Sequence, residues 1–429
     1  MGFHDPREVR ATALDALEAM LRASGQDAAT AASRVVDAAN ATFDRIGDGA
    51  TTTTVLASAL ATEAAHSKLR GESGAAIAES LQSAAGQARD WLQRARRPLP
   101  GELVVHVARS AAHQDTQIAD VVATALMHVG AHGMIYLRSD GDQPSTIIEH
   151  ATLLTPVRVR WALCESLREP RVVLLDVRGD VAALEDTDDD GPRLVISRGP
   201  APSHWHRRGS IVVELQGSAA ERAETLDDLA ALTATTVNAR AFGSVAAAHV
   251  RDSQLRLLGA SGSGVRAHRA ALVGSLSSGC GALRERLYQR IGLVDSRFAI
   301  IRTGSTESTR LRHVERAIAS ARAALVNGVV TGGGIALLRA CQSASIGGRL
   351  LAKAAEMVVS RLVASHGLPG TATVQEVRDR RDGIGFDVEH KRVRDLDACG
   401  VWDAADVIEA CLDHAVIATI QILERVEPR

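Results

Sequence analysis

The chain changes in character twice along its length, and that order constrains its fold more than any single motif does. Residues 6–23, 28–44, 51–67 and 74–95 have apolar positions three and four residues apart, which predicts amphipathic helices. Short β-branched runs separated by turn residues follow, and long apolar helical segments return near the end. This helical, mixed, helical order predicts one helical domain built from both ends of the chain, with an α/β part inserted. The remaining predicted elements are the strands 134–138, 171–176, 193–197, 210–215 and 298–302 and the helices 117–129, 219–232, 307–326, 335–341, 350–365 and 403–423.

Composition narrows the class of protein. Aromatic residues are only 3% of the 429, so the core must be built from Ala, Val, Leu and Ile, and the length suggests two or three domains. The 49 basic and 51 acidic residues predict no general attraction for nucleic acid or membrane. Charges interrupt the apolar runs before the roughly 18 residues that a membrane span needs, and the first residues do not resemble a secretory signal. The five cysteines include no CxxC pair, which favours reduced thiols and a cytoplasmic location.

One motif places a glycine–aspartate–glycine turn directly before a predicted helix. Gly47, Asp48 and Gly49 are followed by Ala50 and by four threonines at 51–54. Free N–H groups at a helix start attract anions, hydroxyls add donors for phosphate oxygens, and Asp48 has the chemistry to hold a divalent cation. An ordinary helix start, with glycine in the turn and threonine as the cap, accounts for the same residues. The motif alone supports phosphate binding and this simpler interpretation equally.

Other motifs point more weakly to ligands. Three glycines at 332–334 stand before a predicted helix, where a bare backbone lets a ligand approach, although a tight turn between helices explains them better. Residues 262–267 match GxGxxA without the acidic residue that a dinucleotide site needs, and residues 186–191 resemble a calcium loop without its final glutamate. We interpret both as loops, and likewise the segment 204–206, whose two histidines lack an evident third metal ligand. The sequence contains no Walker-type phosphate loop.

Two of these stretches together resemble the type I chaperonins, the GroEL-like ring chaperonins. The family's GDGTTTATVLA is similar to residues 47–57, and its RAAVEEGVVAGGGVAL is similar to residues 322–337. Its LQDIATLTGGTV and its GILD are similar to residues 226–237 and 400–403. The resemblance implies an α+β chaperonin architecture with a helical equatorial domain, a small intermediate domain and a shortened α/β apical domain. The implied segments are 1–97 and 328–429 (equatorial), 98–155 and 296–327 (intermediate) and 156–295 (apical).

The resemblance also implies an ATP site with Mg²⁺ in the equatorial domain. Two glycine-flanked corners, distant in the chain, would meet around one triphosphate. The implied residues are Asp48 for the metal, Gly49, Thr51 and Thr52 for phosphates, Gly333 and Asp403 for the ribose, and Asp387 near the base.

Departures from the family pattern bear on activity. The hydrolytic aspartate of the family's RVEDAL is Arg316 here, and a guanidinium stays protonated and cannot accept a proton. Losing a carboxylate that helps to activate the attacking water typically slows a reaction by about 10²–10⁴-fold. Arg316 would still attract phosphate and so favour nucleotide binding without turnover. Ala50 replaces a phosphate-binding threonine, and residues 1–22 match neither the family's LGPKG loop nor its inter-subunit stem. The two apolar apical helices are reduced to about residues 179–184 and to the segment 200–209, which contains prolines and arginines.

Resemblance and departures together predict ATP-dependent protein folding with impaired hydrolysis and a reduced client-binding face. Predicted partners are unfolded clients and a ring, formed by copies of this chain or mixed with a conventional chaperonin. The reduced apical part argues against a co-chaperonin. The alternative is a degenerate paralogue with weak or no nucleotide binding, acting as a scaffold or modifying conventional rings. A third hypothesis, an unrelated enzyme on the same fold, finds no nucleophile–base pair in the sequence.

Overall fold

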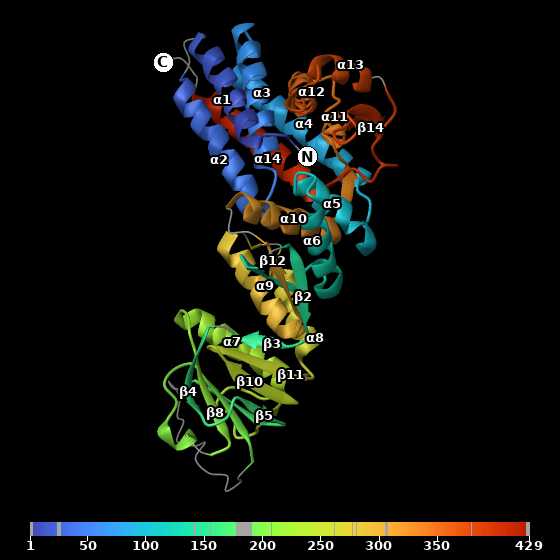
Figure 1. Cartoon of the computed structure of the whole chain (residues 1–429). Helices are drawn as coiled ribbons and strands as arrows, with labels where there is room; N and C mark the ends of the chain where they lie inside the picture. Colours follow the sequence, from blue (N-terminus) through green and yellow to red (C-terminus); the bar gives the residue numbers. More distant parts are fainter. Residues whose placement is uncertain are drawn as a thin grey trace. The chain divides into compact units, whose positions relative to one another are not determined.

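The structure, a computed structural model, describes most of the chain and divides it into two compact units (Figure 1). The described residues are 3–23, 27–140, 143–154, 156–176, 191–206, 208–260, 262–276, 278–279, 281–304, 308–378 and 380–425. Unit 1 comprises Met1–Met127, Ser139–Ser145 and Arg302–Arg429, and unit 2 comprises His128–Arg138 and Thr146–Ile301. Both ends of the chain therefore belong to one unit, while the three-domain boundaries stay predictions.

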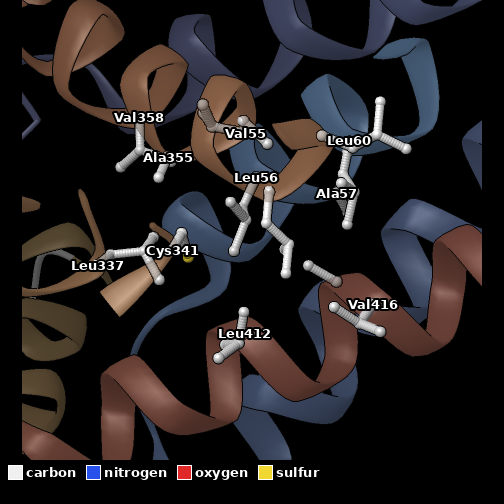
Figure 2. Close-up of a cluster of buried hydrophobic side chains, with 14 of the residues drawn as sticks. Val55, Leu56, Ala57, Leu60, Leu337, Cys341, Ala355, Val358, Leu412 and Val416 are labelled. Atoms are coloured by element: carbon white, nitrogen blue, oxygen red, sulfur yellow. The ribbon is translucent and has the colours of Figure 1, made fainter. Parts of the chain in front are cut away.

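Long helices from both halves of the sequence form the core of unit 1. They are α1 (Pro6–Ala23), α2 (Ala28–Ile46), α3 (Ala50–Leu69), α4 (Gly74–Ala95), α12 (Ile346–Ser365) and α14 (Ala405–Arg425). The last helix, α14, packs against α2, α3 and α4, and α12 packs against α3 and α4. Figure 2 shows Leu56 of α3, Ala355 of α12 and Leu412 of α14 converging on this core.

The sequence of α3 explains its central place. The helix has small and apolar residues of its own on every side, and such a helix is stable only when it is buried. Leu56 and Leu60 are 0% exposed, whereas Leu69 at the end of the helix is 62% exposed. Alanine, valine and leucine fill most of the space around them, as the low aromatic content predicts.

Further elements complete unit 1 and the connection to unit 2. The helices are η1 (Gly101–Leu103), α5 (Val104–Ala111), α6 (Thr116–Val129), α10 (Ser308–Asn327), α11 (Ile335–Ala340) and α13 (Gly370–Arg378). The segment before the three glycines forms strand β13 (Val329–Thr331), which pairs antiparallel with β16 (Trp402–Ala404). A second antiparallel pair joins β14 (Ile384–Asp387) to β15 (Arg392–Asp395).

Unit 2 holds most of the strands. They are β1 (Met134–Arg138), β2 (Ser145–Glu149), β3 (Thr152–Leu154), β4 (Val157–Ala162), β5 (Ser166–Arg168), β6 (Arg171–Leu175), β7 (Arg193–Ser197), β8 (Ser210–Leu215), β9 (Gly243–Ser244), β10 (Ala247–Arg251), β11 (Gln254–Leu258) and β12 (Phe298–Arg302). Three sheets result, with the orders β4-β8-β7-β6-β9, β3-β11-β10-β5 and β1-β12-β2. In the largest sheet β6, β7 and β8 run parallel, and the outer strands are antiparallel.

The parallel strands each contain an unbroken apolar run, at 172–175, 194–196 and 211–213, and both faces of their sheet are covered. Val172 and Leu174 of β6 belong to a core that includes Leu229 of the helix α7 (Ala219–Thr233). Val173 lies between them in the strand but on the opposite face of the sheet, and it belongs to a separate cluster with Trp205. Successive side chains of a strand point to opposite faces, so a strand buried on both sides needs an unbroken apolar run.

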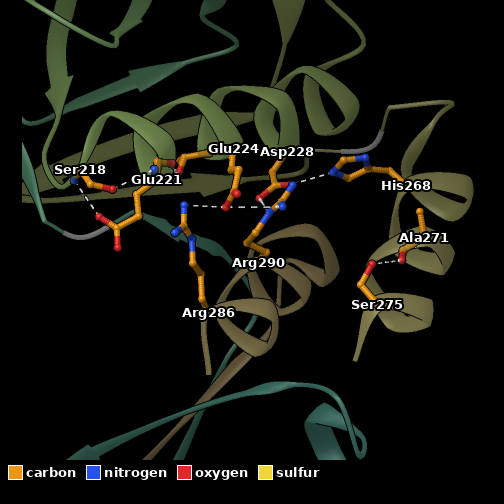
Figure 3. Close-up of polar contacts among 10 residues, drawn as sticks. Ser218, Glu221, Glu224, Asp228, His268, Ala271, Ser275, Arg286 and Arg290 are labelled. Carbon is orange, nitrogen blue, oxygen red and sulfur yellow. Dashed lines mark hydrogen bonds and ion pairs between the residues drawn. The ribbon is translucent and has the colours of Figure 1, made fainter. Parts of the chain in front are cut away.

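Three helices of unit 2 are joined by a buried ion-pair cluster (Figure 3). They are α7, α8 (Val265–Ser275) and α9 (Gly281–Asp295). Asp228 of α7 is 0% exposed and accepts hydrogen bonds from Arg290 of α9 and His268 of α8. The helix α7 begins with a capping box between Ser218 and Glu221.

The structure describes one of the two segments that were predicted to replace the apical helices. The shortened helix near 179–184 and the acidic loop from 186 to 190 lie outside the described residues. In the segment 200–209 the described residues form only the short 3₁₀ helix η3 (Ser203–Trp205). The expectation of a simple surface loop at 204–206 was incomplete, because Trp205 is buried and His206 stacks on Trp161. Across the described ranges, no helix combines the length and apolarity that a membrane crossing requires.

Candidate functional site

A cavity of about 440 Å³ lies in unit 1 at the N-terminal end of α3. Its walls come from the start of α1, from the turn between α2 and α3, from His113 and from α10. The predicted residues Asp48, Thr51 and Arg316 all line it, and so does Ala50. The cavity therefore brings the aspartate of the glycine-rich turn together with an arginine of α10 that is distant in the chain.

The turn that carries Asp48 requires its second glycine. Gly49 has φ +90°, a left-handed conformation that other residues adopt at a cost. A Cβ at this position would lie 2.9 Å from Cys411 Sγ and 3.0 Å from Thr42 Cγ2. The turn can thus pack tightly against α14 only with glycine at position 49.

Both carboxylate oxygens of Asp48 accept hydrogen bonds from α10. Arg316 Nε lies 3.0 Å from Oδ1, and Ser320 Oγ lies 2.5 Å from Oδ2. The two donors are one turn apart on the helix, which places them on the same face. Burial alone would raise the pKa of Asp48, but the neighbouring Arg316, followed by the hydrogen bonds from Ser320 and the Gly49 N–H, holds it below its ordinary value. Asp48 is thus an ionised, buried carboxylate that is already neutralised by an internal cation.

The four threonines after the turn divide into different roles. Thr51 lines the cavity, and its hydroxyl lies 3.5 Å from Arg10 NH1. Thr52 is 5% exposed at the start of α3. Thr54 donates to the carbonyl of Ala50 one turn earlier, at 2.9 Å. Thr53 is fully buried, and its hydroxyl lies 2.9 Å from that of Thr42. Internal hydrogen bonding therefore uses at least two of the four hydroxyls, and none of them caps the helix, because the N-cap residue is Gly49.

Three arginines that belong to no motif of the sequence line the same cavity. Arg7 and Arg10 come from the first turns of α1, and Arg312 lies one turn before Arg316 on α10. With Arg316 they give four guanidiniums against two carboxylates among the described lining residues, a net charge of +2 with neutral histidines. The pKa of Arg10 is lowered, first by burial and then by the other three arginines. The spacings of three on α1 and four on α10 place the arginines of each helix on one face, but the spacing alone does not show that this face lines a cavity.

His113 connects Arg316 to the start of the chain. Its Nδ1 lies 3.1 Å from the carbonyl oxygen of Phe3, and its Nε2 lies 2.5 Å from Arg316 NH1. Burial, followed by the charge of Arg316 and by His313, lowers the pKa of His113 to about 4. At pH 7 the ring is therefore neutral, with Nδ1–H donating to Phe3 and Nε2 accepting from Arg316.

The other predicted residues form a second group. Asp403 lies in β16 opposite Val330 of β13, a few residues before Gly333. A Cβ on Gly333 would lie 3.5 Å from the carbonyl oxygen of Phe386, the neighbour of Asp387. The Asp387 carboxylate accepts hydrogen bonds from the Glu389 backbone N–H at 2.9 Å and lies 2.7 Å from His390 Nδ1.

The two groups approach the same helix without lining the same cavity. Gly49 packs against Val407 and Cys411 in the first turns of α14, and Asp403 lies two residues before the start of that helix. Gly333, Asp387 and Asp403 are not among the described residues that line the cavity. A single nucleotide site that includes both groups stays a prediction.

The cavity does not fit the predicted magnesium ion. Mg²⁺ takes oxygen ligands, usually from one or two carboxylates. Asp48 is bonded through both oxygens to Arg316 and Ser320, and the second lining carboxylate, Asp5, accepts from the N–H groups of Arg7 and Glu8 at the start of α1. Among the described residues, no group of three or more His, Cys, Asp or Glu side chains is arranged to hold a metal.

The structure combines a helical unit built from both chain ends, an inserted α/β unit and a glycine–aspartate–glycine turn before a threonine-rich helix, in the order that the sequence predicted. The chain is 27% identical over 442 residues to Chaperonin GroEL 5 of Bradyrhizobium diazoefficiens, in an alignment that covers 90% of this chain and 81% of that protein. It is thus a distant homologue of the GroEL-type chaperonins, which confirms the resemblance seen in the sequence and supports membership of the type I chaperonin family. No protein-family model matches the chain.

Proposed function

We propose that the chain is a chaperonin-like protein that binds a nucleotide in the cavity of unit 1 and hydrolyses it poorly. The homology to a GroEL-type chaperonin supports a role in ATP-dependent protein folding. The cationic cavity at the start of α3 supports a phosphate-bearing ligand, because guanidiniums and the N-terminal end of a helix both favour phosphate oxygens.

The contact between Arg316 and Asp48 carries the proposal of weak turnover. A chaperonin-type hydrolysis needs a carboxylate to help activate the attacking water, and Arg316 occupies that position. Its guanidinium is committed to Asp48 at 3.0 Å and remains protonated. We therefore expect phosphate release about 10²–10⁴ times slower than from a chaperonin with the aspartate.

The architecture proposed is that of a chaperonin with three domains and a reduced apical part. Unit 1 would contain both equatorial segments, and unit 2 would contain the apical segment. The short η3 helix in the segment 200–209 supports a smaller client-binding face, since one turn of 3₁₀ helix offers no apolar groove. Unfolded clients and a ring of subunits are the corresponding partners.

The same contact also favours a second function. If the Asp48–Arg316 pair keeps nucleotide out, the chain would act as a scaffold or would modify rings of a conventional chaperonin. Electron microscopy of the pure protein, alone and mixed with a conventional chaperonin from the same cell, distinguishes these roles. Rings formed by the chain alone favour a working chaperonin, and mixed rings favour the modifier.

Calorimetry with ATP and a phosphate-release assay test the proposal directly. We expect measurable ATP binding with slow release of phosphate, and brisk turnover by the purified chain would refute the role given to Arg316. Arg316→Asp is expected to raise turnover in the presence of Mg²⁺. Arg310→Asp is the matched control, because it makes the same charge change on α10 at a residue that contacts Gln117 and not the cavity.

A further inference from the structure

We propose that the cavity recognises a di- or triphosphate without a divalent metal, with the Arg316 guanidinium occupying the place beside Asp48 that a metal would take. This inference rests on the proposed function in placing the nucleotide at this cavity. It concerns the chemical form of the ligand, which is the free polyphosphate anion and not its magnesium complex.

The first support is the state of Asp48. Its carboxylate is buried, ionised and bonded through one oxygen to Arg316 and through the other to Ser320. A buried charge needs a partner of opposite sign, and here the partner belongs to the protein. A metal ion would have to displace this guanidinium from a carboxylate that is only 6% exposed.

The second support is the positive charge of the other arginines that line the cavity. Arg7, Arg10 and Arg312 also line the cavity, so a divalent cation would add to a group of like charges. Their mutual repulsion is already felt at Arg10, the pKa of which is lowered by burial and by its arginine neighbours. Like charges that share a site disfavour a further cation and favour an anion.

The third support is the match between the cavity and a polyphosphate. A volume of about 440 Å³ lies in the range of small-molecule sites, which is roughly 300–1,000 Å³. Arg7 and Arg10 approach from α1, and Arg312 and Arg316 approach from α10, so donors surround the space from two elements. Arginine binds phosphate through two parallel N–H···O bonds, and several phosphates in a row use several arginines. The first turn of α3 adds backbone N–H groups with the correct polarity.

Isothermal titration of the full chain with ATP and with inorganic tripolyphosphate, each in EDTA and in excess Mg²⁺, tests the inference. We expect both anions to bind in EDTA, and Mg²⁺ to leave the affinity unchanged or to weaken it. Affinity for ATP at least about tenfold tighter with Mg²⁺ than in EDTA would overturn the inference and leave the proposed nucleotide site standing. Binding of tripolyphosphate but not of ATP would support the metal-free site and overturn the nucleotide proposal. Binding of neither anion would overturn both.

Two variants test the role of single residues. Arg316→Met keeps most of the side-chain volume and leaves Asp48 without its guanidinium partner. We therefore expect Mg²⁺ to tighten ATP binding to this variant, although it does not do so in the unsubstituted protein. Arg10→Gln leaves the Asp48 pair in place, so we expect about tenfold weaker tripolyphosphate binding in EDTA with no new dependence on Mg²⁺. Arg310→Met, on the same helix and outside the cavity lining, should change neither property. An unchanged metal dependence in a folded Arg316→Met protein would contradict the proposal.

Discussion

Removal of the negative charge at Asp228 tests how the ion-pair cluster stabilises unit 2. Asp228 is 0% exposed, and Arg290 donates to it from NH2 at 2.8 Å and from Nε at 2.9 Å, while His268 Nε2 lies 2.6 Å away (Figure 3). Asp228→Asn keeps the size of the side chain, so no cavity forms. The variant leaves the guanidinium of Arg290 without its main counter-charge.

The expected magnitude follows from the burial of the pair. Removing one partner of a buried ion pair costs about 3–5 kcal/mol. The Arg290 side chain retains 19% exposure, and Glu224 lies 3.6 Å from its NH1, so water and a second carboxylate compensate in part. We therefore expect the free energy of unfolding of unit 2 to fall by about 3 kcal/mol, the lower end of that range.

Hydrogen exchange of the amides of α7 in the full chain measures this change in unit 2 itself, because their slowest exchange reports the free energy of opening. Asp252→Asn is the matched control. Its carboxylate is 87% exposed and lies 3.7 Å from Arg251, so we expect a change within about 0.5 kcal/mol. An effect of Asp228→Asn as small as that of the control would show that the cluster adds little stability.

Three further changes have defined outcomes. The folded-state pKa of His113, about 4, lies below its ordinary 6.5, so its contribution to stability is complete above pH 6.5 and is lost as pH falls toward 4. Urea unfolding should show a loss over that window to which His113 contributes up to about 3 kcal/mol, so His113→Gln should make the loss smaller by that amount. Gly49→Ala should cost at least about 2 kcal/mol, against about 1 kcal/mol for Gly71→Ala, because both have φ near +90° but only Gly49 is crowded; equal shifts in Tm would contradict this. Leu56→Ala should cost about 2–5 kcal/mol in urea unfolding, whereas exposed Leu69→Ala on the same helix should cost little.

Periodic segments were the part of the fold that sequence could predict. The helices expected at 6–23 and 74–95 and the strands expected at 134–138, 193–197 and 210–215 have the bounds that the structure gives to α1, α4, β1, β7 and β8. The pattern of apolar residues that predicts each of these elements lies within the element's own residues. The short strands β9 and β13 could not be found in this way, because two or three residues carry no period and their pairing partners are distant in the chain.

The site shows the same limit. The turn around Asp48 and the substitution at Arg316 were each visible in the sequence, but the two residues are 268 positions apart, and only the structure shows their hydrogen bond. Arg7 and Arg10 looked like ordinary surface charges of an amphipathic helix. Their role in the cavity depends on where α1 packs, and no local property of the sequence determines that.

The packing of α14 has a consequence for how the protein is made. This helix completes a core with α2, α3 and α4, yet roughly 360 residues separate Ile46 at the end of α2 from Ala405 at its start. At a translation rate of about 5–20 residues per second, the early helices must wait on the order of 20–70 s for their partner. The α/β segment leaves the ribosome whole during that interval and can fold first, while a polypeptide interrupted before α14 would expose the apolar faces of the helices already made.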